Sequence, residues 1–116
     1  MRSAIAIVGP SGSGKTAAAL QLAKERKGTL ICCDSLQLYE GFVIGSGRPT
    51  VEELGNVETA LYGSFSAHSG YIGPRKYTQL ALQAIEAALM RNNMPVLEGC
   101  NSAYANELSM CEKNVK

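Results

Sequence analysis

The chain has 116 residues and a net charge of +1; 46% of its residues are hydrophobic and 18% are charged. This length allows one domain with a modest core, so residues 1–116 are interpreted as a single domain. The near-neutral charge argues against a strongly basic nucleic-acid-binding surface. The sequence contains no membrane-spanning apolar run, signal peptide or organellar import signal, so we expect a cytoplasmic protein that does not bind membranes.

The first third of the chain alternates between strand and helix patterns. The apolar residues 4–8 predict a buried strand, and residues 15–27 predict a helix that Gly28 ends. Residues 29–33 predict a second strand, with Asp34 at its carboxyl end. The adjacent Cys32 and Cys33 belong to this strand, and the spacing of the four cysteines matches no zinc site. We therefore expect reduced cysteines that act as small hydrophobic residues.

The rest of the chain continues the alternation after a long loop over residues 35–50. The capping-box pattern of residues 50–53 predicts a short helix, whereas residues 55–73 carry many Gly and Ser residues and are the least predictable part of the chain. Three more elements are expected: a helix from Pro74 to about residue 91, a strand over residues 95–98 and a helix over residues 102–110. This alternation predicts an α/β, three-layer fold like that of P-loop NTPases, with a short parallel sheet of about three strands flanked by helices.

A complete phosphate-binding loop follows the first predicted strand. It fits the pattern G-x-x-x-x-G-K-[ST] at every fixed position: Gly9, Pro10, Ser11, Gly12, Ser13, Gly14, Lys15 and Thr16. Glycines allow successive backbone N–H groups to surround an anion, and the following helix adds the positive end of its dipole. Lys15 can neutralise outer phosphate oxygens, and the Thr16 hydroxyl can hold Mg²⁺. The loop predicts a phosphate or diphosphate ligand without selecting a reaction.

The position of Asp34, directly after the second predicted strand, reduces the number of reactions that fit the phosphate loop. The carboxyl ends of parallel strands meet at one edge of a sheet, so we expect Asp34, the phosphate loop and the turn after residue 98 to lie together. A carboxylate in that position can accept a proton from an attacking nucleophile. An aspartate that only caps a turn remains the structural alternative.

Four ordered segments resemble those of isopentenyltransferases that alkylate adenine N6: residues 9–16, 34–39, 45–50 and 99–104. This family comprises tRNA dimethylallyltransferases and the adenylate isopentenyltransferases of cytokinin synthesis. The resemblance extends from residue 4 to about residue 108. Both branches of the family are considerably longer than this chain, so the resemblance implies an incomplete domain.

The resemblance implies roles for individual residues. Lys15 and Thr16, with Mg²⁺, would stabilise the diphosphate that leaves dimethylallyl diphosphate, and Asp34 would accept the proton of the adenine N6 amino group. The remaining candidates would contact the acceptor or a phosphate: Ser35, Gln37, Ser46, Arg48 and Thr50. The implied acceptor is AMP, ADP or ATP, or adenosine in tRNA; the segments 45–54 and 98–104 favour the free nucleotide. Cys100 departs from the family pattern, which has a second glycine there.

Two other functions fit the same residues. A small-molecule kinase would bind ATP on the loop and use Asp34 as the base toward a hydroxyl group. A catalytically inactive remnant would bind nucleotides or diphosphates without turnover. The sequence predicts no particular oligomeric state.

Overall fold

The computed structural model of the chain describes residues 4–8, 15–35, 37–39, 51–99, 104 and 106–108. The elements alternate as expected for an α/β fold: β1 (Ile5–Val8), α1 (Lys15–Glu25), β2 (Gly28–Cys32), α2 (Val51–Leu54), β3 (Glu58–Ala60), a 3₁₀ turn (Ala67–Ser69), α3 (Pro74–Met90) and β4 (Met94–Gly99). Tyr104 and residues 106–108 are also helical. Within these residues, no helix is both long enough and apolar enough to cross a membrane.

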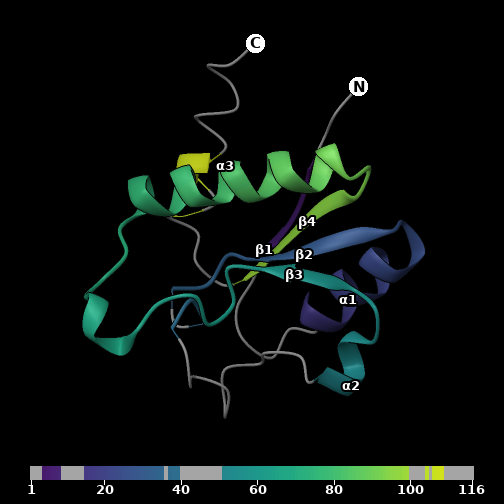
Figure 1. Ribbon diagram of the computed structural model, residues 1–116, viewed down its shortest axis with the longest axis horizontal. Helices are drawn as coiled ribbons and strands as arrows, with labels where there is room; N and C mark the ends of the chain where they lie inside the picture. The colour runs from purple at the N-terminus through teal and green to yellow at the C-terminus, as the bar shows by residue number, and fades with distance from the viewer. Residues whose placement is uncertain are drawn as a thin grey trace.

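The four strands form one parallel sheet in the order β1-β4-β2-β3. Helix α3 lies over one face of this sheet, whereas α1 and α2 lie on the other side (Figure 1). The sheet is therefore the middle layer of three, as the sequence predicts. Helices occupy both faces because parallel strands need long crossover connections, which return across the sheet.

Alternate residues of β2 and β4 supply the two halves of the core. Leu30 pairs with Val96, and both pack with Ala19, Leu20 and Ala23 of α1. The next pair in the register, Ile31 and Leu97, packs against Tyr77 and Ala81 of α3. Successive strand residues point to opposite faces, so two short apolar strands hold both helical layers. Cys32 and Cys33 are both buried in the core, which agrees with their predicted role as small hydrophobic residues.

The predicted strands and the two long helices are confirmed within one or two residues. The sheet differs from the prediction because it contains a fourth strand, β3. This strand has only three residues, Glu58–Ala60, and two of them are exposed, so it lacks the apolar run that identifies a buried strand. Backbone pairing with the buried β2 sets its conformation instead.

The end of α1 also differs from the prediction. Lys27 has the positive φ of 51°, whereas Gly28 is already the first residue of β2. Gly28 is needed there for a different reason. A Cβ atom at this position would lie 3.0 Å from both the Ala23 Cα and the Met94 carbonyl oxygen. The glycine therefore permits close packing between α1, β2 and β4.

Tyr77 ties α3 to the end of β2. Its hydroxyl donates a 2.8 Å hydrogen bond to the Cys32 carbonyl oxygen, and its ring stacks on Tyr104 with centroids 4.1 Å apart. The Tyr104 hydroxyl in turn donates to the Ile72 carbonyl oxygen. Burial raises the pKa of both tyrosines well above their usual range, so both hydroxyls remain donors.

We expect Tyr77→Phe to lower the free energy of unfolding by about 1 kcal/mol, because the Cys32 carbonyl loses its hydroxyl donor while the ring stack remains. Urea unfolding would measure this change. Tyr71→Phe is the matched control, since Tyr71 is 70% exposed and should lose almost nothing. Equal stability of the two variants would contradict the structural role of this hydrogen bond.

Candidate functional site

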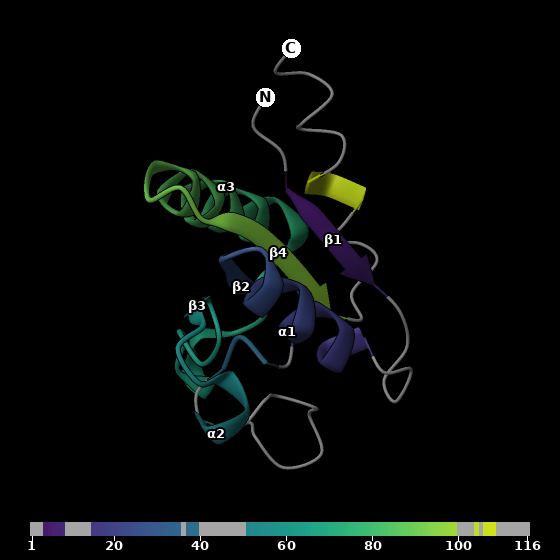
Figure 2. The ribbon, with the colours of Figure 1, turned by 90° about the vertical axis from the view of Figure 1, so that its right-hand side faces the viewer.

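The strand ends and the start of α1 meet at one edge of the sheet. Val8, the last residue of β1, pairs with Gly99 of β4, and Cys32 of β2 pairs with Glu98. Figure 2 shows the arrowheads of β1 and β4 pointing the same way. Asp34 follows β2 by two residues, and the Cys33 nitrogen between them donates a 2.8 Å hydrogen bond to the Glu98 carbonyl oxygen. The sheet therefore brings Asp34 and Glu98 to the edge predicted to hold the site.

Helix α1, which follows the phosphate-loop sequence directly, begins at this edge. Lys15 is the first residue of α1, and Thr16 lies in its first turn. The predicted loop residues Gly9 to Gly14 lie outside the described residues, as does the Lys15 side chain. Thr16 is half-buried, and its Oγ1 donates a 3.1 Å hydrogen bond to Glu98 Oε2. This contact between residues 82 positions apart joins the helix that follows the loop to the end of β4.

Glu98 is the functional candidate that the sequence analysis missed. It is fully buried, and its second oxygen, Oε1, accepts a 2.5 Å hydrogen bond from the Tyr62 hydroxyl. Burial, followed by the nearby Glu98 charge, raises the pKa of Tyr62 well above its usual range, so this hydroxyl remains a donor. The available signal was an acidic residue inside an otherwise apolar strand. Tyr62 gave no such signal, because it follows the unpredicted strand β3.

Asp34 lies in a tightly packed position. It is 5% exposed, and its backbone carbonyl accepts a 3.4 Å hydrogen bond from the Cys32 thiol. Burial raises the pKa of that thiol, so Cys32 stays protonated and can act as the donor. On the other side, a Cβ atom at Gly99 would lie 2.1 Å from the Cys33 carbonyl oxygen and 2.9 Å from the Asp34 nitrogen. Only glycine lets β4 approach the backbone that carries Asp34.

Residues 37–39, which follow Asp34 in the chain, pair through their backbone with residues 63 and 65. Gly63 and Phe65 donate backbone hydrogen bonds of 2.9 and 3.0 Å to the carbonyl oxygens of Gln37 and Leu38. Tyr39 forms an isolated bridge with Phe65. Of the predicted acceptor contacts, Ser35 is half-buried beside Asp34, and Gln37 is 3% exposed. Ser46, Arg48 and Thr50 lie outside the described residues.

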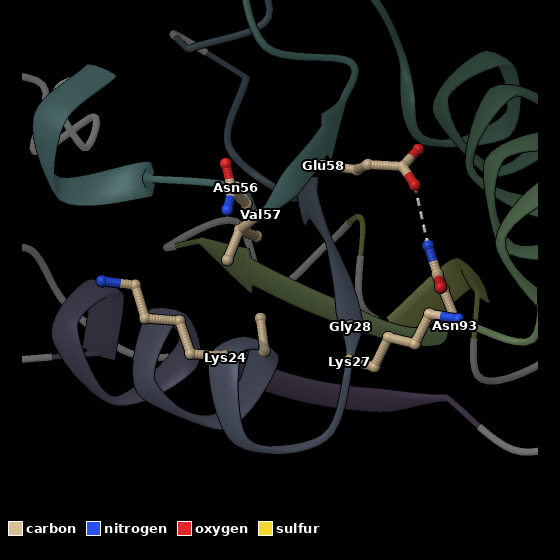
Figure 3. A pocket seen from close by; sticks show the side chains of 8 residues that line it. Lys24, Lys27, Gly28, Asn56, Val57, Glu58 and Asn93 are labelled. Atoms are coloured by element: carbon tan, nitrogen blue, oxygen red, sulfur yellow. Dashed lines mark hydrogen bonds between the residues drawn. The ribbon is translucent and has the colours of Figure 1, made fainter.

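A cavity of about 460 Å³ lies at the opposite edge of the sheet. Its lining includes Lys24, Lys27, Asn56 and Glu58, and Asn93 donates a 3.0 Å hydrogen bond to Glu58 (Figure 3). These positions surround the amino ends of β2, β3 and β4. Ligands of parallel α/β sheets bind at the carboxyl ends of the strands. This cavity is therefore separate from the candidate site.

Residues 2–114 match the family described as isopentenyl transferase. The chain belongs to the isopentenyl transferase family. It is 39% identical over 104 residues to a tRNA dimethylallyltransferase from Nitratidesulfovibrio vulgaris, with 90% of this chain and 33% of the relative covered. It is 33% identical over 104 residues to adenylate isopentenyltransferase 7, mitochondrial, from Arabidopsis thaliana, with 90% and 32% covered.

A solved structure gives the same fold. The tRNA delta(2)-isopentenylpyrophosphate transferase from Staphylococcus epidermidis superposes with a TM-score of 0.85 at 28% identity, over 93% of this chain and 35% of that one. This likeness confirms the predicted α/β architecture. The chain spans about a third of the length of these relatives. Family and fold are thereby shown for this chain, whose sequence includes the phosphate-loop pattern, Asp34 and Glu98.

Proposed function

We propose that this isopentenyl transferase segment transfers a dimethylallyl group from dimethylallyl diphosphate to the N6 amino group of adenine. The observation that carries the proposal is the position of Asp34, buried at the edge of the sheet where α1 begins after the phosphate loop. The proposed base therefore lies at the edge of the sheet where the helix after the phosphate-loop sequence begins. Relatives named for tRNA and for adenylate as acceptors have adenine in common, so adenine is the acceptor group proposed here.

The proposed reaction breaks the bond between the allylic carbon and the diphosphate oxygen, and forms a bond from that carbon to N6. Asp34 takes the proton that N6 loses. The diphosphate leaves with the electron pair of the broken bond, so negative charge grows where the phosphate loop lies. Backbone N–H groups of the phosphate-loop sequence and the Lys15 ammonium would stabilise that charge and so lower the barrier. Because an exocyclic amine is a weak nucleophile, holding N6 in line with the carbon matters as much as the basicity of Asp34.

The proposal includes Mg²⁺, which would offset the charge on the leaving diphosphate. The described donors suit this ion, since a hydroxyl and a carboxylate from Thr16 and Glu98 meet at the edge of the sheet. Such oxygen donors are the ligands that Mg²⁺ prefers. The cytoplasm remains the predicted location of the reaction.

Mass-spectrometric detection of N6-prenylated product tests the function. The purified chain is incubated with Mg²⁺ and dimethylallyl diphosphate, together with AMP, ATP or an unmodified tRNA in separate reactions. We expect product in at least one reaction; product with AMP or ATP identifies a nucleotide acceptor, and product with tRNA alone identifies the RNA. Absence of product in all reactions, from protein shown to be folded, would refute transfer by this chain. Phosphate transfer from ATP to a small hydroxyl compound would instead support a kinase.

A further inference from the structure

Asp34 lies where the chain leaves the sheet. The register between β2 and β3 ends at Ile31, so Cys32, the last residue of β2, already extends beyond β3. On the other side, the Cys33 nitrogen still donates a 2.8 Å hydrogen bond to a carbonyl oxygen of β4. Asp34 therefore comes directly after the residues whose position is set by strand pairing.

Cys32 forms two hydrogen bonds outside the strand ladder. Its carbonyl oxygen accepts a 2.8 Å bond from the Tyr77 hydroxyl of α3, and its thiol donates a 3.4 Å bond to the Asp34 carbonyl oxygen. All three residues are buried, with exposed fractions of 0% to 5%. Burial raises the pKa of the Cys32 thiol, so the thiol remains a donor. Cys32 thus links α3 to the backbone of the proposed base.

Helix α3 is a well-packed support for this link. It has 17 residues and lies over one face of the sheet (Figure 1). Tyr77 belongs to the same core cluster as Ile31 and Leu97, and its ring stacks on Tyr104 with an interplanar angle of 8°. Side chains held by packed helices and strands keep a more precise position than those held by loops alone. Precision matters here, because a displacement of about 1 Å can lower a rate about a hundredfold.

We propose that Cys32 and Tyr77 are positioning residues that hold Asp34 where it takes the N6 proton. The inference rests on the proposed function, in which Asp34 is the base. Tyr77 fixes the end of β2 through the Cys32 carbonyl, and the Cys32 thiol fixes the Asp34 carbonyl, so both residues act through Asp34 rather than on the substrate. The proposal gives α3 a role in the reaction, although none of the site residues predicted from the sequence lies on this helix.

The test measures kcat and KM for prenyl transfer in three variants. Cys32→Ala removes the thiol donor, and we expect kcat to fall about tenfold while KM stays within about twofold, because the base moves and substrate binding does not change. Cys32→Ser supplies a hydroxyl donor at the same position and should regain most of kcat. Tyr77→Phe should lower kcat by about threefold, a smaller factor because this hydroxyl is one bond further from Asp34.

A matched control separates positioning from stability. Ala87→Gly lies about three turns further along α3 than Tyr77 and should destabilise the protein to a similar extent as Tyr77→Phe. We expect Ala87→Gly to keep the kcat of the unmodified chain, because Ala87 is not part of the link to Asp34. Thermal unfolding would show that each variant is folded under the assay conditions.

The possible outcomes distinguish the inference from the proposed function. Unchanged kcat in folded Cys32→Ala and Tyr77→Phe would overturn the inference and leave the proposed function intact. An equal fall in Ala87→Gly would also overturn it, as would a loss in Cys32→Ala that Cys32→Ser does not reverse. If Cys32→Ala does not fold, unchanged kcat in Tyr77→Phe decides against the inference. Absence of product from the unmodified chain would refute the proposed function, and the inference with it.

Discussion

Replacing Asp34 with asparagine is expected to reduce prenyl transfer to adenine by about 10²- to 10⁴-fold, the usual contribution of a positioned general base. The amide has nearly the same size as the carboxylate, but it cannot take the N6 proton. Binding of dimethylallyl diphosphate should change little, because the proposed diphosphate ligands lie on the phosphate loop and at the start of α1. The measurement is the rate of product formation in single-turnover reactions, with ligand affinity determined separately.

A control and a fold check make this prediction specific. Glu52→Gln alters an exposed acid on α2 and should leave the rate unchanged. Because Asp34 is only 5% exposed, thermal unfolding must show that Asp34→Asn retains its structure. A folded Asp34→Asn variant with the rate of the unmodified chain would remove Asp34 from the role of base.

Replacing Gly99 with alanine is the second substitution with a large expected effect. The added Cβ would lie 2.1 Å from the Cys33 carbonyl oxygen, and the contacting atoms belong to the backbone. Relief of this contact requires β4 or the backbone before Asp34 to move. We expect a loss of about 3 kcal/mol in the free energy of unfolding, at the upper end of the usual range for overpacked positions. Urea unfolding would measure this loss.

Gly73→Ala is the matched control for Gly99→Ala. Gly73 precedes α3 with a φ of −72°, and a Cβ atom there meets nothing within 4 Å. A change below about 1 kcal/mol is expected, because alanine is a poorer helix N-cap but also restricts the unfolded chain. If Gly99→Ala is as stable as Gly73→Ala, the close approach of β4 to the Asp34 backbone is not a constraint on this fold.

The apolar runs and the phosphate-loop pattern determined most of the architecture directly. Residues 4–8 and 29–33 are short, apolar and bounded by polar or turn-forming residues, which is why their strands could be predicted. Pro74 marked the start of α3 for an equally local reason, since proline suits the first turn of a helix. Asp34 could be predicted as a candidate base because ligands of parallel α/β sheets bind at the carboxyl ends of the strands.

Tertiary structure decided the features that depend on pairing between distant segments. Strand β3 exists because it pairs with β2, although its own three residues are mostly exposed. Glu98 became a site candidate only when Thr16 and Tyr62 were brought to its two oxygens. Gly99 has a packing role because β2 and β4 are neighbours in the sheet. Sequence patterns report the local periodicity of burial, whereas these contacts depend on strand order and register, which the whole folded chain sets.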